Sequence, residues 1–141
     1  MTESRSSHTE QIIDQYYQYL KARDRVGLAS ILSADIKVIY HAENSRLPWA
    51  GTWEGIDGFD AFLEVIKTHL DIVEVTIDDR IFSEQKAIMQ CRGIWRRRSS
   101  GAEIRGGMVN VFTLSEKQIK QYEVYADTAA FQTVMDENSN T

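Results

Sequence analysis

The segment from Lys86 to Asp127 constrains the fold of this chain most, because three short apolar runs follow one another there. Two polar breaks separate the runs, Ser99-Ser100-Gly101 and Ser115-Glu116-Lys117. Runs rich in β-branched and aromatic residues, joined by short polar turns, are typical of antiparallel strands. We therefore predict a three-stranded antiparallel meander with strands at residues 87–95, 104–114 and 118–125.

Alternation within these runs assigns each residue to a face, because successive side chains of a strand point to opposite sides. One face collects large, soft apolar side chains around a single amide. Its members are Met89, Cys91, Gly93, Trp95, Arg97, Gly106, Met108, Asn110, Phe112, Tyr122, Val124 and Ala126. Such a face is either the wall of a small-molecule pocket or an ordinary core that holds one polar residue.

The overall composition excludes several classes of protein. The 141 residues suffice for one domain with a proper core, and a net charge of −5 argues against non-specific binding to nucleic acid. The basic run Arg96-Arg97-Arg98 cannot form a continuous phosphate track, because alternation on a strand turns its middle side chain away. No apolar stretch approaches the length of a membrane span, and the first ten residues lack the apolar segment of a signal peptide. One cysteine, Cys91, excludes an internal disulfide, so we expect a cytoplasmic protein that binds neither nucleic acid nor membrane.

The remaining elements follow from apolar spacing. Helical spacing predicts a helix over residues 9–23, a shorter one after the favourable N-cap Asp24, and a third over 57–70. Alternation predicts strands at 36–41 and 73–82. Residues 42–55 are expected to form an irregular loop whose two tryptophans, Trp49 and Trp53, must pack on another part of the protein. We expect flexible tails at residues 1–8 and 136–141, which leaves one domain at residues 9–135.

This order of elements favours an α+β fold. Helices come first and a long antiparallel run follows, so the helices should pack on one face of a curved sheet. A sheet that curls around a helix forms a cone, and the interior of a cone is a natural place for a ligand.

Three segments resemble the SnoaL-like family of the NTF2-like superfamily: LPWAGTWEG before a helix, VNVFTL before a turn, and IKQYEVYADTAAF towards the end. The resemblance covers about residues 10–135. It implies a cone-shaped α+β barrel with an internal pocket, usually a homodimer through the outer face of the sheet. The superfamily includes steroid isomerases, polyketide cyclases, dehydratases, epoxide hydrolases and inactive binding domains, so the fold does not decide the function.

The similarity to ketosteroid isomerases suggests roles for single residues. It places Tyr16 at their oxyanion-donating tyrosine and Asn110 at their protonated aspartic acid, so both side chains could donate to a substrate carbonyl. Tyr40 stands at the position of their catalytic aspartate, and a tyrosine is a poor base at neutral pH. The epoxide-hydrolase relatives need an aspartate–arginine–aspartate relay, and Arg97 has no inward aspartates beside it.

Two other residues could move a proton. Histidine ordinarily titrates near neutrality, which suits His41, although alternation places it on the opposite face from Tyr40. Asp127 would lie at the rim of the cone, although an aspartate directly before a predicted helix equally suits an N-cap. Asn110 and Tyr16 also have structural alternatives, as an amide hydrogen-bonded in the core and a hydroxyl tied to backbone.

A set of large side chains could form a box for a flat ligand or could simply be core. Its members are Tyr40, Trp49, Trp53, Phe62, Ile66, Trp95, Met108, Phe112 and Tyr122. Three scattered histidines and one cysteine give no metal-ligand spacing, and we expect neither a metal nor a cofactor.

Two functional hypotheses remain open. In the first, the protein is an isomerase- or cyclase-like enzyme, in which Tyr16 and Asn110 polarise a carbonyl and His41 or Asp127 moves the proton. In the second, it is a non-catalytic module with the same pocket. Both expect a small, largely apolar ligand that carries a carbonyl or hydroxyl group.

Overall fold

The computed structural model describes residues 5–137 and confirms the predicted α+β class. The elements, in chain order, are α1 (Arg5–Ala22), α2 (Arg25–Ile31), β1 (Leu32–Tyr40), β2 (Gly51–Glu54), α3 (Gly55–His69), β3 (Leu70–Phe82), β4 (Lys86–Arg97), β5 (Glu103–Ser115), β6 (Gln118–Ala126) and α4 (Thr128–Glu137). The predicted tails at 1–8 and 136–141 lie partly outside the described residues. Where the structure describes them, residues 5–8 belong to α1 and residues 136–137 to α4.

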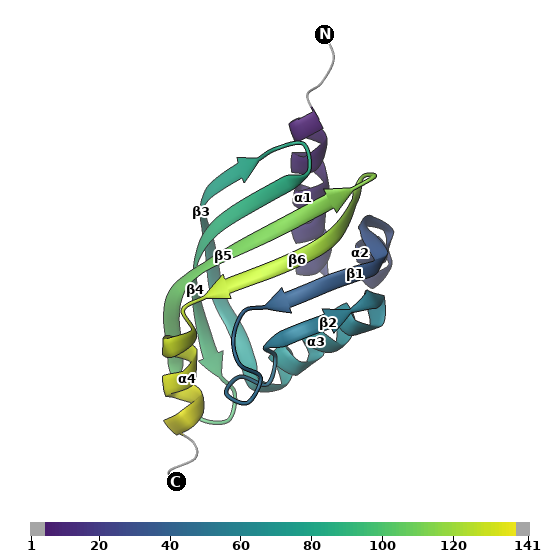
Figure 1. The fold of residues 1–141 in the computed structure, drawn as a ribbon. Helices are drawn as coiled ribbons and strands as arrows, with labels where there is room; N and C mark the ends of the chain where they lie inside the picture. Colours follow the sequence, from purple (N-terminus) through teal and green to yellow (C-terminus); the bar gives the residue numbers. More distant parts are fainter. Residues whose placement is uncertain (1–4, 138–141) are drawn as a thin grey trace.

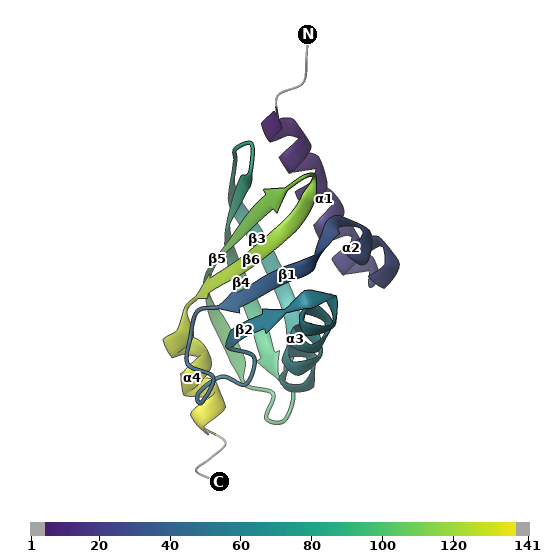
Figure 2. The same cartoon turned by 45° about the vertical axis from the view of Figure 1, so that its right-hand side comes forward.

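The strands form one curved, six-stranded sheet in the order β2-β1-β6-β5-β4-β3, as Figures 1 and 2 show. Strands β4, β5 and β6 pair antiparallel in sequence order, which confirms the predicted meander. Strand β1 runs parallel to β6 and antiparallel to β2. Because Met89 pairs with Asn110 and Phe112 with Tyr122, the residues that alternation assigned to one face do share it.

The prediction of an irregular loop at residues 42–55 is wrong at its end. Residues 51–54 form β2, where Thr52 pairs with Ile39 and Trp53 with Val38. Gly51 enters this strand with φ at +102°, a conformation that is readily available only to glycine. The strand is short and its partner is not adjacent in sequence, so local alternation could not indicate it.

Helices α1 and α3 lie on the same, inner side of the sheet, and α4 lies beyond one end of the strands (Figures 1 and 2). The inner face of the sheet is therefore the one that is buried. In the basic run, Arg97 is buried on this face while Arg96 and Arg98 are exposed, as alternation predicted. No helix in the described part of the chain is long and apolar enough to cross a bilayer.

Candidate functional site

The polar centre of the buried inner face is Asn110, which is only 3% exposed. It lies in the middle of β5, and its amide Nδ2 donates to the hydroxyl of Tyr17 at 3.2 Å. The hydroxyl of Tyr122 on β6 donates to the other end of the amide, Oδ1, at 3.4 Å. A hydrogen bond also links Tyr122 to Tyr16 on α1. We call these four residues, Tyr16, Tyr17, Asn110 and Tyr122, the phenol–amide cluster.

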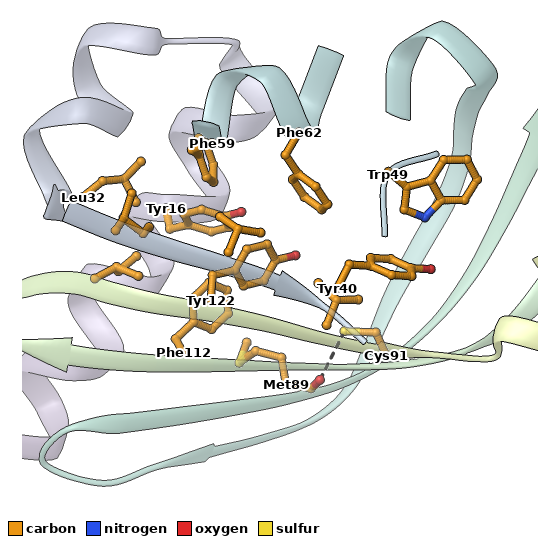
Figure 3. Close-up of a cluster of buried hydrophobic side chains, with 14 of the residues drawn as sticks. Tyr16, Leu32, Tyr40, Trp49, Phe59, Phe62, Met89, Cys91, Phe112 and Tyr122 are labelled. Atoms are coloured by element: carbon orange, nitrogen blue, oxygen red, sulfur yellow. Dashed lines mark hydrogen bonds between the residues drawn. The ribbon is translucent and has the colours of Figure 1, made fainter. Parts of the chain in front are cut away.

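Neighbouring elements determine the position of each phenol in the cluster. The ring of Tyr122 stacks on that of Phe112 with centroids 4.8 Å apart, because the two residues pair in register on β5 and β6. The ring of Tyr16 meets Phe112 edge-on at 5.1 Å and Phe59 of α3 at 6.3 Å. Figure 3 shows these rings gathered between the two helices and the inner face of the sheet. The hydroxyls are thus fixed by aromatic packing.

Burial keeps the phenols of the cluster neutral. Desolvation raises the pKa of Tyr16 far above its ordinary value, and the adjacent Tyr17 adds to the effect. Desolvation also raises the pKa of Tyr17, and the hydrogen bond from Asn110 offsets only part of that rise. The pKa of Tyr122 is raised by burial and by the two other phenols. At neutral pH these three residues are hydrogen-bond donors and not bases.

The other members of the predicted apolar box pack as core around the cluster. Trp49 is buried and its ring lies 6.2 Å from that of Tyr40 and 6.0 Å from that of Phe131. Trp53 is half-buried, and its indole N–H donates to the carbonyl oxygen of Trp49 at 3.0 Å. The two tryptophans therefore pack on the protein interior, as predicted. The remaining members are buried or half-buried on the same side of the sheet: Phe62, Ile66, Trp95, Met108 and Phe112.

His41 lies away from this cluster. It follows β1 with its ring on the outer side of the sheet, stacked on Tyr125 with centroids 4.2 Å apart. Its Nε2 lies 2.9 Å from Oε2 of Glu123, and the hydroxyl of Tyr125 donates to the same oxygen at 3.1 Å. The structure places His41 opposite the buried Tyr40, as alternation predicted, and no bulge brings the imidazole inward.

Asp127 lies at the rim of the inner face and is exposed. Its Oδ1 accepts a hydrogen bond of 3.3 Å from the backbone N–H of Ala130, in the first turn of α4. This is the N-cap contact that we predicted as the structural alternative to a catalytic role of Asp127. Asp127 also packs over Gly106 on β5, about 13 Å along that strand from Asn110 at ~3.3 Å per residue.

Tyr17 is a partner of Asn110 that the sequence pattern did not indicate. Consecutive helical residues point about 100° apart, so periodicity does not predict that both reach the same site. Cys91 lies one row from Asn110 on the inner face, and its thiol contacts the carbonyl oxygen of Met89 at 3.7 Å. Burial raises the pKa of Cys91, so its sulfur stays a neutral thiol.

The chemistry of the site is that of hydrogen-bond donation. Among the residues that the structure describes, the buried polar or charged side chains besides tyrosine and cysteine are Thr9, Arg97 and Asn110. Among residues 7–136, whose burial the structure describes, the interior thus holds several neutral donors and no buried carboxylate or imidazole. Within the same residues, no three histidine, cysteine or acidic side chains come together as a metal site.

Two surface depressions lie outside the cluster. One, of about 210 Å³, lies where His8 and Thr9 of α1 meet the turns after β3 and β5. The other, of about 620 Å³, crosses β3, β4 and β5 beside Arg92 and Arg105. The apolar side chains around the phenol–amide cluster are buried or half-buried members of the hydrophobic core.

Comparison with known proteins identifies the family. The sequence matches the family described as SnoaL-like domain over residues 13–122, which is most of the chain. A comparison with curated protein sequences gives no significant match.

Solved structures share the whole fold at low sequence identity. An NTF2-like protein of Burkholderia xenovorans LB400 is 19% identical, with a TM-score of 0.81 over 92% of this chain and 97% of its own. A protein described as a SnoaL-like polyketide cyclase of Jannaschia sp. CCS1 is 18% identical, with a TM-score of 0.77 over 96% of each chain. TerC, co-crystallised with polyporic acid, is 18% identical, with a TM-score of 0.80 over 92% of this chain and 98% of its own.

Proposed function

Because this chain belongs to the SnoaL-like family, we propose that it binds a small, largely apolar molecule whose carbonyl or hydroxyl group meets the phenol–amide cluster. The observation that carries the proposal is the hydrogen bonding of Asn110. Its amide has two N–H groups, and one of them donates to Tyr17. Among the described residues no acceptor takes the second, although the side chain is buried. A buried donor without an acceptor is costly, and a ligand oxygen would satisfy it.

The surroundings of Asn110 support a ligand that is apolar apart from this oxygen. The rings of Phe59, Phe62 and Phe112 pack against the phenols, as Figure 3 shows. Neutral phenols and an amide can donate to a carbonyl or a phenol oxygen without bringing a charge into the core. A ligand with one polar end and a flat apolar body matches both features.

We favour binding over acid–base catalysis because, among the described residues, neither candidate base lies near the donors. His41 lies on the outer face, hydrogen-bonded to Glu123. Asp127 packs over Gly106. Gly106 lies about 13 Å from Asn110 along β5. A base that removes a proton beside a carbonyl must lie within hydrogen-bond reach of the adjacent carbon, about 3 Å from it. A carbonyl held by Asn110 would leave both candidate bases too far away.

The names of the structural relatives are compatible with this proposal. TerC was co-crystallised with polyporic acid, and another relative is described as a polyketide cyclase. At 18% identity these relatives support the fold, and the ligand class proposed for this chain comes from its own cluster.

The test is the affinity for 2-naphthol, a flat bicyclic phenol, compared with naphthalene, which lacks the hydroxyl. The wild-type protein should prefer 2-naphthol, and fluorescence titration would give both dissociation constants. Asn110→Leu and Tyr17→Phe each remove a hydrogen-bonding group and should weaken 2-naphthol binding about five-fold while sparing naphthalene. Tyr125→Phe, which changes an exposed phenol on the outer face, is the matched control.

Two results would contradict the proposal. One is equal affinity of the wild-type protein for the two probes. The other is a preference for 2-naphthol that survives both Asn110→Leu and Tyr17→Phe.

We also propose that two copies of the chain pair through the outer face of the sheet. The helices cover the inner face, and an apolar stripe remains on the outer one. The stripe contains exposed Ile81 and Tyr125 and the half-buried residues Ile88, Val109 and Val111. A contiguous apolar stripe on a sheet without a covering layer favours packing against a second sheet.

Sedimentation velocity would test this pairing. The wild-type protein should sediment as a dimer, and Val111→Lys should shift it to the monomer because a buried lysine opposes assembly. Val26→Lys on α2, where the side chain is 83% exposed, should leave the dimer intact. A wild-type protein that remains a monomer at high concentration would refute the pairing.

A further inference from the structure

The Trp95 indole lies directly over Gly93 on the inner face of β4. A Cβ atom placed on Gly93 would come within 2.2 Å of Cη2 of Trp95 and within 2.6 Å of Cζ2. The far edge of the indole therefore occupies the space where any other residue at position 93 would carry its side chain. Both residues are buried.

Gly93 belongs to a cross-strand pair of two glycines. It lies opposite Gly106 of β5 in the register of the sheet. Asp127 covers Gly106, since a Cβ on that glycine would lie 3.1 Å from Cβ of Asp127. The two glycines thus form a flat patch of bare backbone on the inner face, with Trp95 over one half and Asp127 over the other.

The adjacent strand leaves this patch close to solvent. Val75 of β3 pairs with Gly93, and Ile77 pairs with Cys91, so both side chains belong to the inner face. Their exposures are nevertheless 41% and 37%, whereas Gly93 and Cys91 are buried. The inner face is therefore open along β3, directly beside the position of the indole.

The Trp95 side chain is held in place by packing in the core rather than by a hydrogen bond. Its ring packs on Phe131 of α4, with centroids 4.9 Å apart. Among the described residues, its indole N–H makes no hydrogen bond, in contrast with that of Trp53. A rotation about its side-chain bonds would break aromatic packing and no hydrogen bond.

We infer that Gly93 and Gly106 form the floor of a second subsite, which receives the flat ring system of an elongated polycyclic ligand when Trp95 turns away. The inference rests on the proposed function, since the polar end of the same ligand would meet Asn110. In this structure the indole occupies the subsite in place of the ligand's own ring. Bare backbone at both glycines lets a flat ring lie against the sheet.

The distance between the two subsites defines the class of ligand. Asn110 and Gly106 are four residues apart on β5, which is about 13 Å. A molecule that donates or accepts at Asn110 and also covers the glycines must be roughly 10 Å long or more. A linear polycycle with a terminal hydroxyl or carbonyl meets this requirement, whereas a bicyclic phenol would reach only the phenol–amide cluster.

The experiment compares two fluorescent phenols, 2-naphthol as the short probe and 2-anthrol as the long one. Trp95→Phe keeps a ring against Phe131 but lacks the atoms that cover Gly93, so it should bind 2-anthrol about five-fold more tightly than the wild-type protein. Its affinity for 2-naphthol should stay within about two-fold. Trp95→Ala should enhance 2-anthrol binding in the same way, provided that urea unfolding shows that it is folded.

Two glycine substitutions, one on each face of β5, test whether the glycines form the floor of the subsite. Gly106→Ala places a methyl group on the subsite and should weaken 2-anthrol binding, whereas Gly107→Ala points to the outer face and should not. The inference is overturned if Trp95→Phe leaves 2-anthrol affinity unchanged or changes both probes equally. If Asn110→Leu bound 2-naphthol as tightly as the wild-type protein does, the proposed function would be refuted instead. The two failures are therefore distinguishable.

Discussion

The guanidinium of Arg97, buried on the inner face of β4, donates a hydrogen bond of 2.9 Å to the carbonyl oxygen of Val134 in α4. The same Nη1 donates to the carbonyl oxygen of Met135 at 2.8 Å. The last carbonyl groups of a helix have no partners within the helix, and its C-terminus carries partial negative charge. Arg97 supplies both the donor and the charge, and so it holds α4 against the end of the sheet.

We predict that Arg97→Met destabilises the fold by about 2 kcal/mol, because the two carbonyl groups lose their buried donor. The loss should be concentrated in α4, and hydrogen exchange of its amides should accelerate. Arg96→Met on the opposite, exposed face is the control and should change stability by no more than about 0.5 kcal/mol. Equal effects of the two substitutions in urea unfolding would contradict this role of Arg97.

A methyl group at position 93 should be poorly tolerated. We predict that Gly93→Ala costs about 2 kcal/mol, because the new Cβ would overlap the Trp95 ring and force it from its position. Gly107→Ala has its nearest neighbour at 3.8 Å, the carbonyl oxygen of Cys91, and should be nearly neutral. Urea unfolding measures both, and a change in near-ultraviolet circular dichroism should accompany only Gly93→Ala. The absence of that change would show that the indole does not depend on the bare glycine.

A carboxyl group in place of the buried amide should make stability depend on pH. Burial would raise the pKa of the aspartic acid in Asn110→Asp above its unfolded value of about 3.9. The neutral acid can still donate to Tyr17 and accept from Tyr122, so the variant should approach wild-type stability at acidic pH. This stability should be lost as pH rises through the folded pKa, to a deficit of about 3 kcal/mol at neutral pH.

Urea unfolding of Asn110→Asp and wild-type protein at several pH values would give this difference. Asn110→Leu provides the reference, because its deficit should not vary with pH. A deficit of Asn110→Asp that is equally constant would mean that position 110 is more hydrated than its burial indicates.

The outer face should show the opposite dependence on pH. Partial burial tends to raise the pKa of Glu123, but hydrogen bonds from His41, Gln121 and Tyr125 outweigh it, so the pKa lies below its ordinary value. A carboxyl group with a lowered folded pKa contributes stability above its unfolded pKa of about 4.3, and the contribution disappears as pH falls through the folded pKa. Glu123→Gln should therefore be less stable than wild type at pH 7, by about 1 kcal/mol, and the difference should shrink in acid.

The check for Glu123 is a comparison of unfolding free energies between pH 7 and the acid range. Glu54→Gln, with an exposed carboxylate on β2, serves as the control. A stability difference for Glu123→Gln that persists unchanged at low pH would show that its carboxylate does not stabilise the outer face.

Much of the fold follows from local patterns. Alternation assigned Met89, Asn110 and Tyr122 to one face, and the register of β4, β5 and β6 confirms it. The capping contact of Asp127 and the outward position of His41 also followed from local rules. Strand β2 did not, because four residues give too short a pattern and its pairing with β1 crosses a loop.

The amino-acid sequence by itself determined which side chains face inward and that one amide lies among them, because strand alternation and helical spacing are local properties of the chain. Only the tertiary structure decided what that amide meets. Tyr17 and Asn110 are 93 positions apart, and His41 and Glu123 are 82 apart. The Trp95 ring lies over Gly93 in a packing environment to which α4 contributes Phe131. Such contacts depend on how distant elements pack, and a pattern read along the chain does not contain that packing.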